Sequence, residues 1–317
     1  IHGLELDSRC VELAAFALAF AAWRYPDAGR YRVLPTINVA CSGLAVTGKK
    51  AEWKALARGN TNLELALGGL HDLFADAPVL GSLIDPAVSE FSNLSNLDSL
   101  SQTLAGALAQ GTTETDESAI TAKGLASAAL FLSKKYTFVI TNVPYLGRGN
   151  QVELLQEFCA NHYSEAKSDL ATVFLERCLK FCAEGGSTSI VLPQNWLFLT
   201  TYRKFREKLL KAHTWHFIAR LGPQAFQTPM WDFNVQMIFI SRGNQQVNDG
   251  GLFASDDAGN LIRGVDVSEA RGASEKAQAL LNTEVKTIEQ KKQLENPDAR
   301  VALDDAEDMD LLIKFAN

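Results

Sequence analysis

The chain has 317 residues, of which 47% are hydrophobic and 21% charged, and its formal net charge is −7. This composition is typical of a globular protein with one large core. The negative balance argues against a protein that binds nucleic acid over its whole surface, because phosphate contacts need clustered Lys and Arg. No apolar run approaches the length of a membrane span and the first residues lack the layout of a signal peptide, so we expect a cytoplasmic protein without membrane contact.

The five cysteines predict neither disulfides nor a metal site. Their number is odd and their surroundings are apolar, as is typical of reduced core residues. Cys178 and Cys182 are four positions apart on a predicted helix, a spacing that could bind a metal. No other Cys or His pair completes such a site, and His213 with His216 is isolated. We therefore expect no metal.

The first predicted element is a short strand over residues 1–6, followed by a helix that Asp7 or Ser8 can cap. In nucleotide-binding α/β folds an acid at the end of the second strand accepts hydrogen bonds from ribose hydroxyls. Glu5, with Leu6 beside it, is our candidate for this cofactor contact, and the alternative is an ordinary strand-end acid. The strand and Gly-rich turn that normally precede this point are missing, so we expect a fragment of a longer protein.

Residues 36–40 read as the next strand, and the loop after it contains Ser42, which we expect beside the base of the cofactor. An acid that could serve the same purpose comes only later, at Asp76. Residues from about 49 to 134 are rich in Leu, Ala, Ser and Thr. We interpret this stretch as a mainly helical insertion with a flexible tip.

The stretch 136–145, with the sequence YTFVITNVPY, organises the rest of the chain. Its uninterrupted apolar residues predict a strand buried on both faces of a parallel sheet. Pro144 lacks an amide hydrogen and disfavours a helical conformation at Val143, so the strand ends in a rigid, extended turn. Such a turn at the carboxyl end of a strand is where open α/β sheets bind their ligands.

The residues of this turn suit methyl transfer to an amino group conjugated with a ring. Such a nitrogen is a poor nucleophile unless acceptors, here the Asn142 side-chain oxygen and the Val143 carbonyl, draw its lone pair away from the ring. Both acceptors must be fixed beforehand, and Pro144 supplies that rigidity. Tyr145 offers a flat face for a base, a contact worth about 1–3 kcal/mol. The alternative is a strand followed by an ordinary Asn-X-Pro turn.

After the turn, residues 150–167 predict a polar loop with a helical middle, and Ser168 or Asp169 caps a core helix. A strand over 189–192, a helix over 202–212 and strands over 216–221 and 234–241 complete the predicted sheet. Trp196 and Phe226 are candidate substrate-binding aromatics, together with Trp231, although an aromatic in a packed loop is commoner. Several basic residues lie close together in the helix 202–212, which a solvated helix face explains equally well.

Four segments in this order carry a resemblance to a known family: Gly3-Leu4-Glu5-Leu6-Asp7, Asn142-Val143-Pro144-Tyr145-Leu146-Gly147, Ser168-Asp169-Leu170 and Leu192-Pro193-Gln194-Asn195-Trp196-Leu197. The chain resembles adenine-N6 DNA methyltransferases, especially the Type IIG restriction-modification and phage-exclusion enzymes. Their Asn-Pro-Pro-Tyr motif appears here as Asn-Val-Pro-Tyr. The resemblance implies an α/β, Rossmann-like sheet, S-adenosylmethionine as donor, and an adenine flipped out of duplex DNA.

This resemblance covers roughly residues 1–242, which we interpret as the catalytic core. Residues 243–317 are interpreted as a linker and a helical arm for partner contacts. We expect one amphipathic helix in this arm, over residues 268–295. Family members carry a separate target-recognition domain for DNA, and none is evident here. Two other functions remain open. One is a protein-glutamine or RNA amino methyltransferase, because an amide nitrogen can use the same two acceptors. The other is a catalytically inactive module that binds DNA or a partner.

Overall fold

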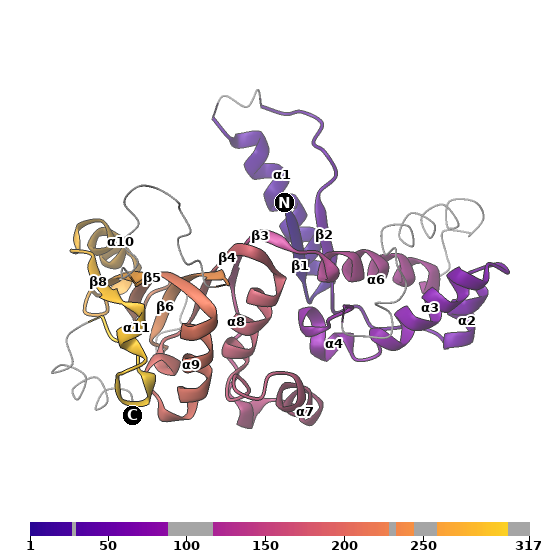
Figure 1. Ribbon diagram of the computed structural model, residues 1–317. Helices are drawn as coiled ribbons and strands as arrows, with labels where there is room; N and C mark the ends of the chain where they lie inside the picture. Colours follow the sequence, from indigo (N-terminus) through magenta and orange to yellow (C-terminus); the bar gives the residue numbers. More distant parts are fainter. Residues whose placement is uncertain (27–29, 88–116, 228–232, 244–258, 304–317) are drawn as a thin grey trace, which may run out of the picture. The chain divides into compact units, whose positions relative to one another are not determined.

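The computed structural model describes residues 1–26, 30–87, 117–227, 233–243 and 259–303, which form two compact units, 1–134 and 135–317 (Figure 1). The boundary that the sequence suggested at 242/243 does not coincide with the division between these units. Trp231 and the polar tip of the expected insertion lie outside the described residues.

The first unit is built on a two-stranded parallel sheet of β1 (His2–Glu5) and β2 (Asn38–Cys41), in which Gly3 pairs with Val39 and Glu5 with Cys41. Helix α1 (Ser8–Arg24) follows β1, and the Asp7 side chain caps it by accepting from the Arg9 amide at 2.8 Å. The expected insertion is helical where it is described: α2 (Lys50–Ala55), α3 (Thr61–Leu73), α4 (Ala77–Leu80), the 3-10 turn η1 (Gly81–Leu83) and α6 (Glu117–Ser133).

The core of this unit lies between α6 and its neighbours. Most of the side chains of α6 are small or apolar, and eight of its residues are buried, among them Leu125 and Phe131. Helix α6 packs against β1, β2, α2 and α3. Trp53 of α2 is fully buried and its indole N–H donates to the Thr47 carbonyl at 2.7 Å, so burial leaves this polar group satisfied.

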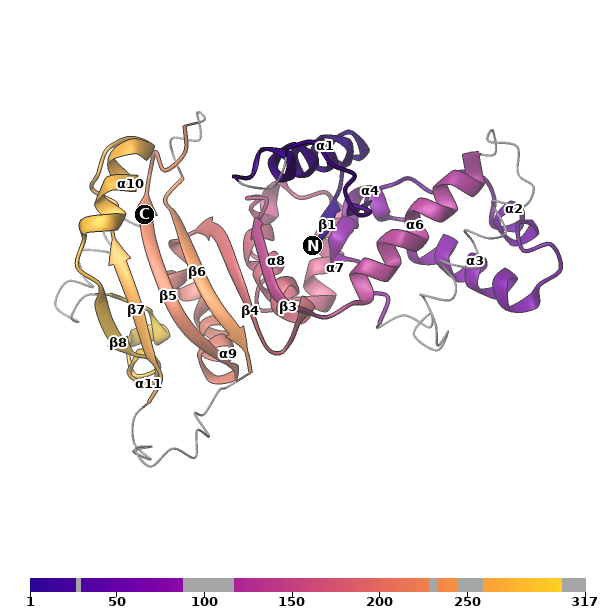
Figure 2. The same ribbon diagram turned by 90° about the horizontal axis from the view of Figure 1, so that it is seen from above.

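The second unit is a six-stranded mixed sheet with helices on both faces, and its strands lie in the order β3-β4-β6-β5-β7-β8 (Figure 2). The strands are β3 (Tyr136–Asn142), β4 (Cys182–Pro193), β5 (His213–Gly222), β6 (Val235–Arg242), β7 (Leu261–Asp266) and β8 (Lys286–Glu289). Pairs β3/β4 and β5/β7 are parallel, whereas β6 runs antiparallel to β4 and β5 and β8 antiparallel to β7. The α/β class predicted from the sequence is therefore confirmed.

The helices of this unit are α7 (Glu153–His162), α8 (Leu170–Phe181), α9 (Arg203–Ala212), α10 (Gly272–Asn282) and α11 (Gln290–Gln293). Short 3-10 turns lie at η3 (Arg148–Asn150), η4 (Asn195–Leu197), η5 (Thr200–Tyr202) and η6 (Pro297–Ala299). Helix α8 packs on β3 and β4, α9 on β5, and α10 contributes Ala279 and Leu280 to a cluster on the sheet. Asp169 caps α8 as expected, accepting from the Ala171 amide at 2.8 Å.

Two expectations about this unit are wrong. Strand β3 is not buried on both faces: it lies at the edge of the described sheet, and Phe138 and Ile140 are 50% and 73% exposed. The stretch 268–295 is not one helix, because α10 ends at Asn282 and the chain returns to the sheet as β8. Strands β7 and β8 pair within the same sheet as β3, so this part of the expected arm belongs to the second unit.

Candidate functional site

The carboxyl ends of β1 and β2 meet at one edge because the two strands are parallel. There the amide and the hydroxyl of Ser42 both donate to the Glu5 carbonyl, at 2.7 and 3.2 Å. The same hydroxyl lies 3.1 Å from the hydroxyl of Ser82 in η1. The predicted residues Glu5 and Ser42 are thus brought together, and a third segment that the sequence analysis had not singled out joins them.

Two glycines allow these segments to approach closely. A Cβ on Gly43 would lie 2.3 Å from the Leu6 carbonyl oxygen, and a Cβ on Gly81 would lie 2.7 Å from Cδ1 of Leu6. Gly81 also has a φ of +48°, a conformation that side chains disfavour. Gly81 and Ser82 were missed because an isolated Gly-Ser pair within an apolar stretch carries no signal for what it will contact.

The Glu5 carboxylate is oriented by its own backbone. Its Oε1 accepts from the Leu6 amide at 2.7 Å and from the Asp7 amide at 3.4 Å. The Leu6 side chain beside it is about half exposed and offers an apolar surface at the same edge. Asp76 is exposed at the start of α4, five residues before Gly81, and its side chain does not cap that helix. The structure describes no contact that joins Asp76 to Glu5 or Ser42.

In the second unit, the turn after β3, residues 142–145, is held at both ends; we call these four residues the elbow. Asn142 pairs with Val191 of β4, and the Val143 amide donates to the Val191 carbonyl at 3.4 Å. Beyond the elbow, the Leu146 carbonyl accepts from the Leu170 amide at 3.0 Å and from the Gln151 side chain at 2.9 Å. The elbow therefore connects a strand to the anchored start of α8.

Tyr145 connects the parts of the elbow. Its hydroxyl donates to Oδ1 of Asn142 at 3.0 Å, and burial raises its pKa to about 12, so it remains a donor at neutral pH. The ring lies 5.7 Å from that of Phe233, at an interplanar angle of 59°. Both Tyr145 and Phe226 pack on a cluster of buried side chains that includes Val235 and Val265. Phe233, which is 45% exposed, was missed because an aromatic residue just before a strand carries no signal for what it will contact.

Trp196 is placed differently from the other predicted aromatics. It is 1% exposed, its ring lies edge-on to Phe205 at 5.6 Å, and it lies 5.7 Å from Trp215. A ring enclosed in this way has no free face for a base. The structure therefore assigns Trp196 to the packing beneath the loop after β4, whereas Phe226 is only partly buried.

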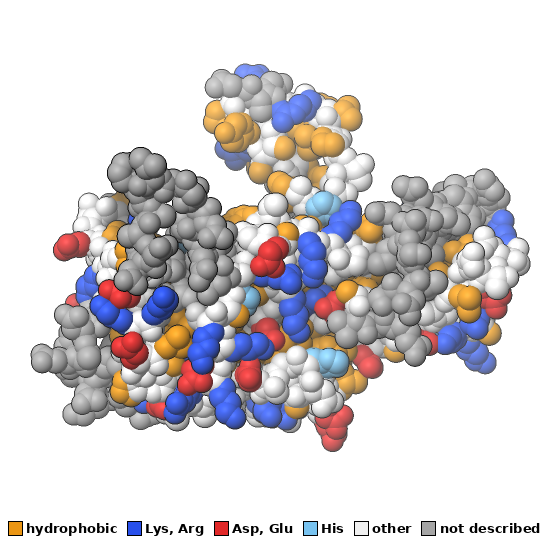
Figure 3. All heavy atoms as spheres, in the orientation of Figure 1, with side chains coloured by type: hydrophobic (Ala, Val, Ile, Leu, Met, Phe, Trp, Pro, Cys, Tyr) orange, Lys and Arg blue, Asp and Glu red, His pale blue; other side chains and the backbone are white. Residues whose placement is uncertain are grey.

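The basic residues of the helix predicted over 202–212 do not form a continuous basic patch. In α9, Lys208 lies 3.0 Å from Glu176 and 3.3 Å from Glu165, Arg203 lies 2.8 Å from Glu207, and Arg206 is buried. Figure 3 shows acidic and basic side chains intermixed on this face of α8 and α9. Such mixing reduces the attraction for phosphate that a continuous basic patch would provide.

The cysteines and acidic side chains do not form a metal site in the part of the chain that the structure describes. Within the described residues, no group of three His, Cys, Asp or Glu side chains could hold a metal ion. Cys178 and Cys182 are buried, and burial raises the pKa of their thiols to about 12 and 11, so both stay protonated. Among the helices that the structure describes, none is both long enough and apolar enough to cross a membrane.

This chain is similar to a family of restriction-modification methylases and to two curated methyltransferases. The sequence profile of the Eco57I restriction-modification methylase family matches residues 1–226. The adenine-specific methyltransferase PglX of Lacticaseibacillus casei (strain Zhang) is 28% identical over 232 residues, which are 72% of this chain and 19% of PglX. The adenine-specific methyltransferase BrxX of Escherichia coli O9:H4 (strain HS) is 26% identical over 250 residues, 71% of this chain and 20% of BrxX.

Among solved structures, the DrdV–DNA complex is similar in fold, with a TM-score of 0.50 and 14% identity over 90% of this chain and 24% of that chain. The chain spans about a fifth of the length of the two curated relatives. The family match includes the edge of β1 and β2 and the elbow, but it ends before β6, β7 and β8.

Proposed function

Because this chain belongs to the Eco57I restriction-modification methylase family, we propose that it is the catalytic part of a DNA methyltransferase that methylates N6 of adenine. The observation that carries the proposal is the elbow, in which the Asn142 amide oxygen is oriented by Tyr145 at the anchored end of β3. The names of PglX and BrxX favour adenine as the base. Duplex DNA is the proposed partner, reached through a target-recognition domain.

The valine of the elbow is compatible with catalysis. The family motif has proline at this position, where the backbone carbonyl is the functional group. Val143 keeps that carbonyl, its side chain is buried, and its amide bonds to the Val191 carbonyl, which proline could not do. We infer that this hydrogen bond replaces the rigidity that the missing proline would give.

The first unit suits the cofactor S-adenosylmethionine. Gly43 and Gly81 let the loop after β2 and η1 pack closely against Leu6, which brings Ser42 and Ser82 to the same edge as Glu5. We propose that the Glu5 carboxylate accepts hydrogen bonds from the ribose hydroxyls and that the exposed Leu6 side chain and Ser42 lie beside the adenine ring, with Asp76 as a further polar contact. When bound, this cofactor supplies a methyl group already activated by its sulfonium.

The elbow then acts on the target amine. The Asn142 side-chain oxygen and the Val143 carbonyl accept one N–H each, which localises the lone pair on the nitrogen before attack. Tyr145 stacks on the base, and Phe226 borders the same apolar cluster. Extraction of the base from the duplex costs a few kcal/mol, which stacking and edge contacts offset.

The experiment that tests this function is transfer of labelled methyl to duplex DNA by the natural full-length protein. We expect Asn142→Ala to lower kcat by about 10²–10³, the usual effect of removing one preorganised polar group. Retained activity in that variant would overturn the assignment of the elbow. Transfer to RNA or to a protein glutamine, with none to DNA, would replace the substrate, and binding of DNA without any transfer would favour an inactive module.

A further inference from the structure

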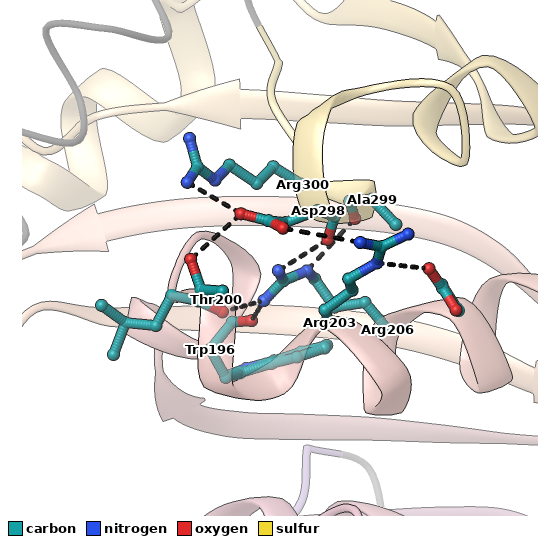
Figure 4. Close-up of polar contacts among 9 residues, drawn as sticks. Trp196, Thr200, Arg203, Arg206, Asp298, Ala299 and Arg300 are labelled. Carbon is teal, nitrogen blue, oxygen red and sulfur yellow. Dashed lines mark hydrogen bonds and ion pairs between the residues drawn. The ribbon is translucent and has the colours of Figure 1, made fainter.

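The loop after β4, residues 194–199, is held by one fully buried side chain, Arg206 of α9 (Figure 4). Nη1 of Arg206 donates to the Trp196 carbonyl and, at 2.8 Å, to the Leu199 carbonyl. Nη2 and Nε reach the other way, to the carbonyls of Asp298 at 2.8 Å and Ala299 at 3.1 Å. One planar guanidinium thus joins this loop to η6 through four backbone acceptors.

The contacts of Arg206 differ from those of an ordinary ion pair. Among the described residues, no carboxylate accepts a hydrogen bond from Arg206. The nearby Asp298 carboxylate instead accepts from Thr200 at 3.0 Å and Arg300 at 3.1 Å. Burial lowers the pKa of Arg206 to about 10, which still leaves it charged at neutral pH. A lysine could not reproduce these contacts, because it lacks the fixed fork of N–H donors.

We call the contacts of Arg206 with residues 194–199 and with η6 the clamp. On the η6 side, these contacts hold a strained turn. Asp298 and Ala299 have φ values of +55° and +50°, a left-handed conformation that non-glycine residues rarely adopt. Two such residues in succession persist only where the surroundings fix them. Here their carbonyls are the two that Arg206 binds, and the Val301 amide adds a hydrogen bond to the Leu197 carbonyl at 3.2 Å.

The clamped loop is connected to the elbow by short contacts. The Gln194 amide donates to the Asn234 carbonyl at 2.8 Å, which fixes the start of β6. Phe233 directly precedes Asn234, and its ring is the one that lies against Tyr145. The Gln194 side chain also accepts from Nε of Arg220 at 3.4 Å. Movement of the loop would therefore displace Phe233 relative to the elbow.

We propose that Arg206 is a positioning residue for methyl transfer, which keeps Phe233 against Tyr145 by clamping residues 194–199 onto Asp298 and Ala299. The inference rests on the function proposed for the elbow. It gives η6 a role in the reaction although η6 lies outside the residues that match the family. Displacements of about 1 Å far from the reacting atoms can cost about 10²-fold in rate. We therefore expect the loss of the Arg206 contacts to lower kcat.

The test uses the full-length protein with Arg206→Lys and, as matched control, Lys204→Met on an exposed position of the same helix. We expect Arg206→Lys to lower kcat by about 10–100-fold while the KM for S-adenosylmethionine stays within about twofold. When duplex DNA carries 2-aminopurine at the target position, its fluorescence emission with Arg206→Lys should differ from that with the wild type. The reason is that the flipped base stacks less well on Tyr145 in the variant. Lys204→Met should match the wild type in all three measurements.

If Arg206→Lys does not fold, Asp298→Gly loosens η6 instead, because it removes the carboxylate that accepts from Thr200 and Arg300 and frees the backbone of residue 298, and it should lower kcat by about 3–10-fold. If Arg206→Lys folds and has the kcat and the fluorescence emission of the wild type, this inference is overturned while the proposed function stands. If Arg206→Lys does not fold, the same result in Asp298→Gly overturns it. Absence of transfer by the wild type would overturn the proposed function and the inference with it. A loss confined to KM would also overturn the positioning role.

Discussion

The edge of β1 and β2 and the elbow after β3 are shaped by opposite means. At the first, the segments meet because side chains are missing: Gly43 and Gly81 let two loops approach Leu6. At the second, shape comes from side chains, with Tyr145 against Phe233 and the buried Arg206 and Arg220 behind the neighbouring loop. Substitutions that add volume should therefore disturb the first region most. Substitutions that remove a charge or a hydrogen bond should disturb the second region most.

The largest effect is expected from Asp266→Ala in the second unit. Arg220 is 5% exposed and its Nη1 lies 2.7 Å from Asp266, so the variant leaves a buried guanidinium without its partner. We expect the free energy of unfolding to fall by about 3 kcal/mol, measured by urea denaturation. The Ser268 amide and hydroxyl, which also bond to Asp266, add to this loss.

The matched control is Asp72→Ala in the first unit, where Asp72 pairs with Lys50 but is 57% exposed. Exposed pairs contribute only about 0–1 kcal/mol. Equal losses in the two variants would contradict the claim that buried charge distinguishes the second unit.

A smaller effect is expected from Gly43→Ala in the first unit. The added methyl would lie 2.3 Å from the Leu6 carbonyl oxygen, which cannot rotate away as a side chain could. We expect a loss of about 1–3 kcal/mol in stability and weaker binding of S-adenosylmethionine, measured by calorimetry. Gly149→Ala serves as control because no atom beyond its chain neighbours lies within 4 Å of the added Cβ. Unchanged affinity in Gly43→Ala would show that the close approach at this edge has no role in cofactor binding.

The smallest effect is expected from Tyr145→Phe, which keeps the ring and removes the hydrogen bond to Asn142. A single hydrogen bond contributes about 0.5–1.5 kcal/mol, so kcat should fall by about 3–10-fold in a methyl-transfer assay. Because the pKa of Tyr145 is raised to about 12, its hydroxyl stays protonated, and the wild-type rate should show no titration of this group between roughly pH 7 and 10. A rate equal to wild type would mean that Asn142 is oriented without Tyr145.

Local patterns in the sequence predicted much of this fold. Strands β5 and β6, helix α8 with its Asp169 cap and the turn after β3 follow from apolar periodicity and from the properties of proline and capping residues. The elbow could be located because Pro144 ends the strand and the four residues that form it are adjacent. Glu5 and Ser42 could be placed together because parallel strands end at the same edge.

Long-range contacts could not be predicted in this way. Ser82 joins Ser42 across 40 positions, and Arg206 reaches Asp298 across 92. Nothing near either residue indicates its partner. The burial of β3 was also misjudged, since an apolar run shows that a strand is favourable but not which neighbours will cover it. For β8, four residues between two helices gave too short a pattern to separate a strand from a helix.

The open side of β3 has a practical consequence. In the part of the chain that the structure describes, this strand pairs with β4 only, and Phe138 and Ile140 remain exposed. An unpaired apolar edge can recruit the backbone of another molecule, which is the usual route to intermolecular β-aggregation. Purified samples of this chain should therefore become turbid as they are concentrated, and Ile140→Lys should improve solubility by disfavouring such pairing.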